Sequence, residues 1–224
     1  MSKRVIAFSS GGPGNFRSTL EFSLAHQDIK LVHLITDRPG IPSLDLAAQY
    51  GIASCVEPIV GRLNMSDPAS VFRRIQALDR IYSRLCDIES AGGLIDLIVL
   101  AFRKVLLGPI IDRFGPRMIN VHPSDLSVHN VSDRRRRYTG LNGLKKAITD
   151  GNATTRTTIH RVDSGIDTGA LLCLGPSVPF AGNRASDADI DRHEQLQKEQ
   201  SDAVALNHAL HCWFYGDPRC CSIL

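Results

Sequence analysis

Short apolar runs alternate along the chain with segments in which apolar residues recur at helical spacing. Apolar runs of this length that end at glycine, proline or aspartate predict strands. Strands are expected at 4–10, 31–36, 53–59, 95–102 and 118–122. Helices are expected to begin with Asn15 and Ser43 as capping residues, and to occupy 68–90 and 106–114. Strands that alternate with helices indicate β-α-β units, and therefore an α/β fold with an open, mostly parallel, Rossmann-like sheet and helices on both faces.

The pattern changes after residue 122. A long polar loop is expected at 124–140, then a short helix at 141–149, strands at 154–162 and 170–180, and a helical end at 187–215. The chain has no internal repeat and no low-complexity linker, so we expect a single domain spanning 1–224. Within it we expect a nucleotide- or phosphate-binding half at 1–122, catalytic loops and strands at 123–182, and a C-terminal helix and tail at 183–224.

The composition is that of an ordinary soluble globular protein, with 43% hydrophobic and 22% charged residues. The net charge of +3 is too small to predict a nucleic-acid partner. No apolar run approaches the roughly 20 residues of a membrane-spanning helix, and the first residues lack a signal-peptide pattern, so we expect a cytoplasmic protein. The six cysteines lack C-x-x-C spacing and most have apolar neighbours, which predicts reduced thiols. No His, Cys or Asp set has metal-ligand spacing, so no metal is expected, and His129 and His160 are interpreted as surface or strand residues.

The last four residues, Cys221 to Leu224, loosely fit a prenylation motif in which a final leucine favours geranylgeranylation. Short motifs of this kind also match by chance. Prenylation at Cys221 and a chance cysteine near the terminus are therefore both kept as interpretations.

Two polar residues close the expected strand at 118–122. Asn120 and His122 are two positions apart, so their side chains point to the same side of the strand. Asp167 lies in a separate glycine-flanked loop, 165–169. An amide, an imidazole and a carboxylate suit the attack of an amine on a carbonyl, because they can stabilise an oxyanion and accept a proton. The alternative is a buried histidine bonded to backbone, with Asn120 closing a turn.

A glycine-rich loop joins the first expected strand to the first helix. Its free N–H groups and the helix N-terminus would suit an anion such as phosphate. The loop lacks the lysine of a P-loop and matches G-x-G-x-x-G poorly, so a tight turn is the alternative interpretation. The candidate phosphate-binding residues are Gly11, Gly12, Gly14 and Asn15.

Taken together, these motifs resemble the folate-dependent formyltransferases, and most closely the glycinamide ribonucleotide formyltransferase branch. The resemblance runs in order from about residue 4 to residue 182. Asn120 to Ser124 reads N-V-H-P-S, and a G-I-D-T-G loop follows at 165–169. Each motif alone is common, whereas the pair in this order and spacing is specific.

The resemblance implies formyl transfer from 10-formyltetrahydrofolate, as co-substrate, to a primary amine, and its closest branch implies that of glycinamide ribonucleotide in purine biosynthesis. Asn120 and His122 would hold the oxyanion, while Asp167 would support His122, assist proton transfer and contact the folate. The expected partner is a small phosphorylated amine, and the expected assembly is a monomer or a homodimer. The remaining folate-binding residues implied by the resemblance are Phe102, Lys104, Val105 and Leu106.

Two departures from the family pattern concern the substrate. A glycine that the family usually has before Phe102 is missing, and the loop 125–138 is longer than the family's and carries an arginine run. That run is either solvated or a clamp for an anionic substrate, since guanidinium groups suit phosphate. Its members are Arg134, Arg135, Arg136 and Arg137.

Other functions therefore stay open. The acceptor could be an amino sugar nucleotide or methionyl-tRNA, although nucleic acid is not expected. Hydrolysis of formyltetrahydrofolate is a further alternative; that class normally carries an N-terminal regulatory domain, whereas this chain begins at its first strand. A formyltransferase-like binding protein without turnover is the non-enzymatic alternative.

Overall fold

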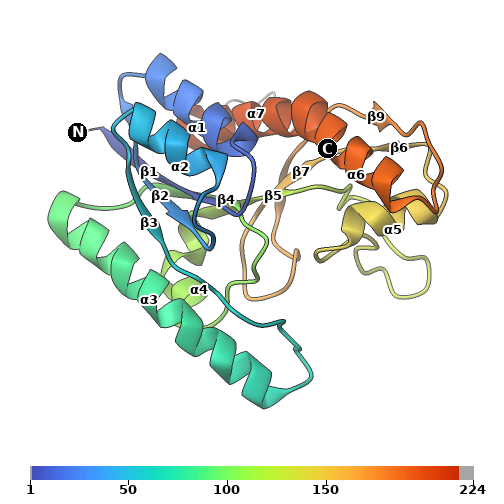
Figure 1. Ribbon diagram of the computed structural model, residues 1–224, viewed down its shortest axis with the longest axis horizontal. Helices are drawn as coiled ribbons and strands as arrows, with labels where there is room; N and C mark the ends of the chain where they lie inside the picture. Colours follow the sequence, from blue (N-terminus) through green and yellow to red (C-terminus); the bar gives the residue numbers. More distant parts are fainter. Residues whose placement is uncertain (1, 217–224) are drawn as a thin grey trace. The chain divides into compact units, whose positions relative to one another are not determined.

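The computed structural model describes residues 2–216 (Figure 1). These residues divide into two compact units, one formed by residues 2–119 with Val162–Ser164, the other by Asn120–Arg161 and residues 165–216. The expectation of a single domain with inner divisions after residues 122 and 182 stays a prediction.

The first unit is built from β-α-β repeats. Its strands are β1 (Lys3–Ser9), β2 (Ile29–Thr36), β3 (Ala53–Val56) and β4 (Leu97–Ala101). Its helices are α1 (Gly14–Ala25), α2 (Pro42–Gln49), α3 (Pro68–Gly92) and α4 (Pro109–Phe114), followed by the 3-10 turn η1 (Gly115–Arg117). β1 pairs in parallel with β2 and β4, and β2 pairs in parallel with β3. This confirms the predicted parallel arrangement.

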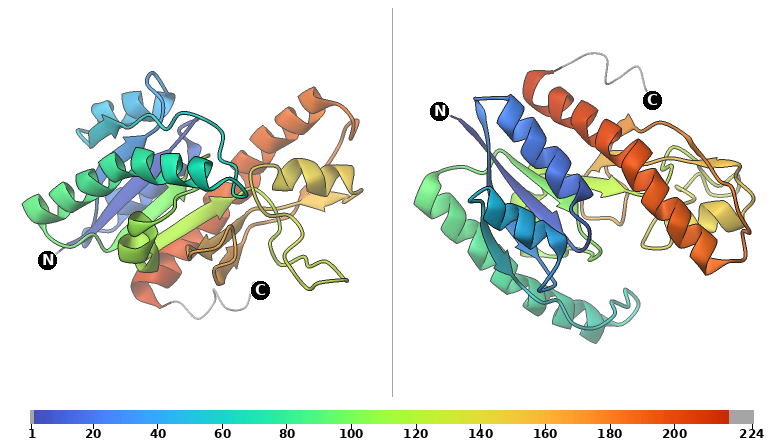
Figure 2. Two further views of the ribbon diagram at one scale, coloured as in Figure 1. Left: turned by 90° about the horizontal axis from the view of Figure 1, so that it is seen from below. Right: turned by 45° about the horizontal axis from the view of Figure 1, so that its top comes forward.

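Helices cover both faces of these strands, with α1 and α2 on one side and α3 and α4 on the other (Figures 1 and 2). The apolar side chains of β1 and β4 pack against α3 and α4 in the main core, which includes Phe8, Leu78, Ile98 and Phe114. Strands covered on both faces need apolar residues at successive positions, which explains the continuous apolar runs.

The two predicted helix caps are wrong. Pro13 occupies the N-cap of α1 and Ile41 that of α2, and neither makes a side-chain capping bond. Asn15 lies within α1. Ser43 is used differently: its hydroxyl lies 3.0 Å from Ser9 Oγ and donates to the carbonyl of Gly11 at 3.3 Å. For Ser43, long-range hydrogen bonds therefore replace local capping.

The second unit begins within β5 (Met118–His122), at Asn120. It continues through α5 (Gly143–Thr149), β6 (Thr154–Thr155), β7 (Thr158–Arg161), β8 (Leu171–Leu174), β9 (Val178–Pro179), α6 (Asp187–Gln197), the π-helical turn η2 (Lys198–Asp202) and α7 (Ala203–Tyr215). β7 pairs antiparallel with β8, and β6 pairs antiparallel with β9 in a separate two-stranded sheet. The strand order of the larger sheet is β3-β2-β1-β4-β5-β7-β8, which confirms an open, mostly parallel sheet.

The strands predicted at 154–162 and 170–180 each divide in two. Thr157 lies at the first break, where its N–H donates to Ser201 Oγ at 3.0 Å and its carbonyl accepts from the N–H of Gly175 at 2.8 Å. The chain therefore leaves one sheet and enters the other at a point where its backbone is bonded to η2 and to the segment after β8.

The expected loop at 124–140 contains a small hairpin. His129 and Arg136 form an antiparallel bridge. On either side of it, the N–H of Asn130 donates to Arg135 O at 2.8 Å and the N–H of Arg137 donates to Val128 O at 2.9 Å. We call residues 128–137 the arginine hairpin. Its backbone bonds give the arginine run a defined geometry that composition alone did not predict.

Within residues 2–216, no helix is long and apolar enough to cross a membrane. Cys55, Cys86 and Cys173 are free thiols, as predicted. Cys212 is disulfide-bonded, so the prediction of a reduced thiol is wrong for this residue. The suggested prenylation site, Cys221, lies outside the described residues.

Candidate functional site

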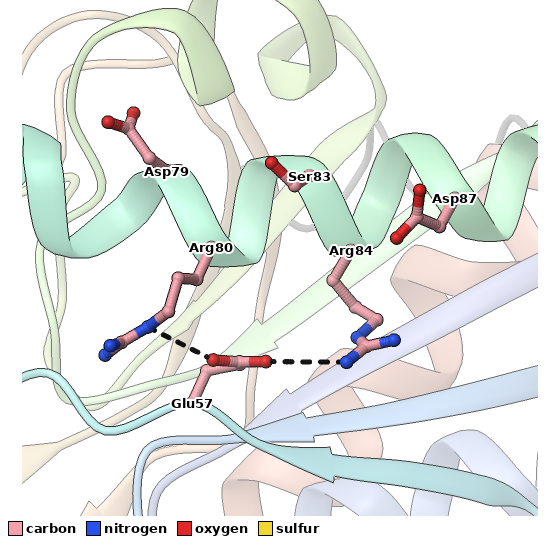
Figure 3. Close-up of a pocket in the computed structure, with 6 residues that line it drawn as sticks. All are labelled: Glu57, Asp79, Arg80, Ser83, Arg84 and Asp87. Carbon is pink, nitrogen blue, oxygen red and sulfur yellow. Dashed lines mark ion pairs between the residues drawn. The ribbon is translucent and has the colours of Figure 1, made fainter.

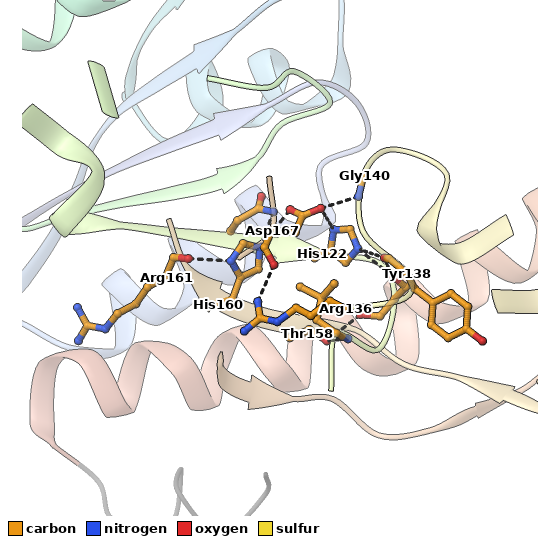
Figure 4. Close-up of polar contacts among 11 residues, drawn as sticks. His122, Arg136, Tyr138, Gly140, Thr158, His160, Arg161 and Asp167 are labelled. Atoms are coloured by element: carbon orange, nitrogen blue, oxygen red, sulfur yellow. Dashed lines mark hydrogen bonds and ion pairs between the residues drawn. The ribbon is translucent and has the colours of Figure 1, made fainter. Parts of the chain in front are cut away.

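His122 lies at the carboxyl end of β5 and is 4% exposed. Its Nε2 is 2.8 Å from the carbonyl oxygen of Tyr138 and 2.7 Å from the hydroxyl of Ser124, which itself donates to the same carbonyl (Figure 4). The carbonyl only accepts and the Ser124 hydroxyl already donates to it, so Nε2 can either donate to this pair or accept from the hydroxyl. Nδ1 is the ring nitrogen that faces Asp167.

Asp167 meets that nitrogen. Its Oδ2 is 3.4 Å from His122 Nδ1 and accepts the N–H of Gly140 at 2.6 Å (Figure 4). The backbone of Asp167 is left-handed, with φ of 56°, which is uncommon outside glycine. A Cβ at Gly165 would meet the Thr168 side chain, so glycine leaves room for this side chain in the tight loop that carries Asp167.

The charges of this pair follow from burial and hydrogen bonding. Burial opposes ionisation of Asp167, but hydrogen bonding to His160, the proximity of His122 and the Gly140 N–H together lower the pKa of its carboxyl from 3.8 to about 2. Burial lowers the pKa of His122 below 6.5, against the opposing effect of the Asp167 carboxylate. A carboxylate therefore faces a neutral imidazole at neutral pH.

His160, on β7, completes the cluster and was missed as a site residue. Its Nε2 is 3.1 Å from Asn120 Nδ2 and 3.4 Å from Asp167 Oδ1, and its Nδ1 is 2.7 Å from the carbonyl of Arg161. His160 is buried and sits near the end of its strand, as His122 does. That shared position is the sequence feature that could have revealed it.

The structure thus brings together three predicted catalytic residues, Asn120, His122 and Asp167, all in the second unit. The amide nitrogen of Asn120 lies 3.1 Å from His160 Nε2 and carries two hydrogens. The cluster therefore places an N–H donor, an imidazole and a carboxylate close together, joined by contacts of 3.1 to 3.4 Å. Such a set can stabilise an oxyanion and accept a proton.

The predicted phosphate loop lies in the first unit, between the end of β1 and the start of α1. Ser10 anchors it: its N–H donates to Ala101 O at 3.2 Å, and its hydroxyl accepts the N–H of Arg103 at 2.9 Å. A Cβ added at Gly11, Gly12 or Gly14 would meet nothing within 4 Å. The fold itself does not require these glycines, so the open space beside them is available to a ligand.

The predicted folate-binding residues follow β4 in the same unit. Phe102 packs edge-on against Phe8, with ring centroids 5.3 Å apart. The Lys104 ammonium is 3.5 Å from the Asp37 carboxylate, and Leu106 is part of the core. These contacts fix the segment after β4 without occupying the Lys104 side chain completely, since it stays partly exposed.

The four arginines do not act as one group. Arg136 Nη1 donates to the main-chain carbonyl of Asp167 at 2.6 Å. Arg137 pairs with Asp150 at 2.9 Å, while Arg134 and Arg135 are exposed. Arg136 therefore contacts the residue that pairs with His122, whereas Arg137 bonds elsewhere and the other two are exposed.

Two open hollows of about 340 Å³ each are lined mainly by other residues. In the first, Glu57 forms ion pairs with Arg80 at 3.5 Å and Arg84 at 3.9 Å on α3 (Figure 3). The second lies in the other unit, where Asp125 and Arg156 form an ion pair at 2.7 Å. Among residues 2–216, no group of three or more His, Cys, Asp or Glu side chains could hold a metal ion.

The comparison with known proteins decides the family. The model of the formyl transferase family matches residues 3–177. The chain belongs to the formyl transferase family. This confirms the resemblance drawn from the two motifs, and the open sheet agrees with the fold of the family members whose structures are solved.

The most similar relatives include purine-biosynthetic proteins. The trifunctional purine biosynthetic protein adenosine-3 of Drosophila melanogaster is 31% identical over 176 residues, which is 76% of this chain and 11% of that protein. The phosphoribosylglycinamide formyltransferase of Bacillus subtilis is 24% identical over 92% of this chain and 89% of its own. The chain thus spans about a tenth of the first relative's length and most of the second's.

Solved structures agree in fold. The phosphoribosylglycinamide formyltransferase of Brucella melitensis superimposes with a TM-score of 0.66 at 22% identity, covering 97% of both chains. A formyltetrahydrofolate deformylase from Pseudomonas syringae gives 0.68 at 18% identity, covering 94% of this chain and 60% of its own. This formyl transferase therefore shares its fold with enzymes of two reaction types.

Proposed function

We propose that this formyl transferase moves the formyl group of 10-formyltetrahydrofolate to the primary amine of glycinamide ribonucleotide, as a step of purine biosynthesis. The observation that carries the proposal is the convergence of Asn120, His122 and Asp167 in one buried cluster. The named relatives that are phosphoribosylglycinamide formyltransferases support the choice of acceptor.

The reaction needs an N–H donor for the oxyanion, a proton acceptor, and a negative charge that stabilises the protonated acceptor. The amine nitrogen attacks the formyl carbon, the carbonyl electron pair moves to oxygen, and the attacking nitrogen loses a proton as the bond to the folate nitrogen breaks and that nitrogen gains one. Asn120 donates an N–H to the developing oxyanion. His122 accepts the proton, and the Asp167 carboxylate beside its Nδ1 stabilises the imidazolium that forms. The oxyanion contact expected of His122 stays a prediction beside this role.

The first unit supplies the substrate-binding elements of the proposal. Gly11, Gly12, Gly14 and Asn15 bind the phosphate of the acceptor at the start of α1, and the segment from Phe102 to Leu106 contacts the folate. The open space beside the glycines supports the first assignment. The cytoplasmic location and the monomeric or homodimeric state stay predictions.

Incubating the protein with formyltetrahydrofolate and glycinamide ribonucleotide tests the proposal. Formylated ribonucleotide, with tetrahydrofolate in equal amount, is the expected product. Formate in place of the formylated amine would assign hydrolysis instead, and no turnover with any amine would assign a binding protein. A panel of phosphorylated amines, an amino sugar nucleotide and methionyl-tRNA completes the acceptor test.

The variant His122→Ala connects the reaction to the cluster. Its rate should fall on the order of a hundredfold or more, because it removes the proton acceptor. His208→Ala, which changes an exposed histidine on α7, is the matched control and should keep the wild-type rate.

A further inference from the structure

The arginine hairpin contributes more than a charged surface. Its last residues and the short segment that follows make three contacts with the catalytic cluster. The Arg136 guanidinium bonds the Asp167 carbonyl, the Tyr138 carbonyl faces His122 Nε2, and the Gly140 N–H bonds the Asp167 carboxylate. Five residues of chain therefore hold both members of the proton-accepting pair.

We propose that Arg136 is a positioning residue, whose hydrogen bond to the main chain of Asp167 directs the Asp167 carboxylate toward His122. The proposal rests on the proposed function for its kinetic consequence, but its structural claim can be tested without any substrate. It assigns a role to the loop that departs in length from the family pattern.

The geometry of Asp167 explains why a second anchor is useful. With φ of 56°, its backbone is in a region that costs a non-glycine residue about 1 kcal/mol or more, and such conformations persist only when the surroundings enforce them. Gly140 anchors the carboxylate, whereas Arg136 anchors the carbonyl at 2.6 Å. Fixing both ends of the residue fixes the direction of its side chain.

Arg136 is itself held in register. The backbone bonds from Asn130 to Arg135 and from Arg137 to Val128 flank it on both sides. Two contacts at its C-terminal end hold the hairpin in place. Arg137 pairs with Asp150, and the buried Tyr138, which follows the hairpin, accepts a hydrogen bond from Asn152 through its hydroxyl at 3.1 Å. A guanidinium carried on so constrained a strand loses little freedom when it bonds Asp167.

The positive charge of Arg136 also acts on His122. Burial is the main cause that lowers the pKa of His122, and Arg136 lowers it further, whereas Asp167 raises it. Removing Arg136 therefore changes that pKa in two opposing ways. A test must separate the lost charge from the displaced carboxylate.

A double-mutant cycle separates the two effects, with the pKa of His122 measured in each variant by NMR titration of its ring. In the wild-type background, Asp167→Asn should lower the His122 pKa, because the stabilising carboxylate is removed. In the Arg136→Met background, the same replacement should lower it less, because the carboxylate has already turned away. An equal decrease in both backgrounds would overturn the proposal.

The control is Arg135→Met, which removes one charge from the same hairpin at an exposed position. Its backbone carbonyl, which bonds the N–H of Asn130, is kept in this variant. In this background Asp167→Asn should have its full effect on the His122 pKa. A reduced effect equal to that in Arg136→Met would assign the result to the hairpin's charge and overturn the proposal. If Arg136→Met does not fold, Arg136→Lys, which keeps the charge and loses the planar fork, carries the same cycle.

Kinetics give the second arm. Arg136→Ala should lower kcat roughly ten- to a hundredfold, the effect of losing one hydrogen bond from a charged donor, with a smaller change in KM for the acceptor. Added guanidinium should restore part of kcat. Arg192→Ala, an exposed arginine on α6, should leave the rate unchanged. Failure of formyl transfer by the wild type would reject the proposed function while the titration cycle still decides the role of Arg136.

Discussion

Nδ1 of His122 and Oδ2 of Asp167 lie 3.4 Å apart, with side chains only 5% and 11% exposed. Solvent screens so buried a pair weakly, and each group sets the protonation of the other. The pair therefore affects both turnover and the free energy of unfolding, and each can be measured in variants.

The pH dependence of stability should report Asp167. Its pKa falls from 3.8 to about 2 on folding, which corresponds to about 2 kcal/mol of unfolding free energy. Because the folded-state pKa is the lower one, this contribution is complete above about pH 4 and disappears as the pH falls toward 2, where the unfolded chain takes up the proton first.

Urea unfolding at pH 5, 4, 3 and 2, compared between the wild type and Asp167→Asn, isolates this residue from other carboxylates. The difference in unfolding free energy between the two proteins should shrink by about 2 kcal/mol across this range. A difference that stays constant with pH would show that the Asp167 carboxyl has an ordinary pKa in the folded protein.

Asn120 should be needed for turnover more than for folding. Asn120→Ala removes the proposed oxyanion donor, which typically costs a hundred- to a thousandfold in kcat. Asn142 provides the control, since it is exposed at the start of α5 and makes no side-chain capping bond. Steady-state rates for both variants decide the matter; equal rates in Asn120→Ala and the wild type would remove Asn120 from the mechanism.

Gly143, the first residue of α5, supports His122 by having no side chain. A Cβ there would clash with the carbonyl oxygen of Tyr138 and lie 3.1 Å from His122 Nε2. Gly143→Ala should therefore lower the free energy of unfolding by about 1–3 kcal/mol, although alanine favours helices. It should also reduce kcat, because the Tyr138 carbonyl must move.

Gly14→Ala is the matched control for stability, because Gly14 is also the first residue of a helix and a Cβ there would meet nothing within 4 Å. Thermal unfolding of both variants should show a lower Tm only for Gly143→Ala. If the two variants unfolded at the same temperature, the close packing around His122 would not be the reason for glycine at 143.

The sequence predicted β5 correctly because the strand signal is local: an apolar run, two polar residues on one face and a proline. It also predicted that Asp167 would join Asn120 and His122, but only through the family resemblance, since nothing local connects residues 47 positions apart. The left-handed backbone of Asp167 and the Gly140 N–H that holds it are not visible in composition or spacing.

The errors share a physical cause. Asn15 and Ser43 were assigned as caps because capping is local, yet Ser43 bonds across the fold to Ser9 and Gly11. The strand predicted at 154–162 divided because Thr157 bonds to the distant Ser201. Local patterns predict where helices and strands lie along the chain, whereas long-range hydrogen bonds affect where a helix begins or a strand is interrupted.

Another long-range contact predicts a role for Gln197, at the end of α6. Its Nε2 donates to the carbonyl of Pro123, the residue after His122, at 3.0 Å and to Thr157 Oγ1 at 3.2 Å. Gln197→Met keeps the volume but leaves the buried acceptors without this donor, so the free energy of unfolding should fall by about 1–3 kcal/mol. Gln195→Met, two residues earlier and exposed, should change it by less than about 0.5 kcal/mol. Urea unfolding of both variants measures the difference, and equal stabilities would mean that the end of β5 is held without Gln197.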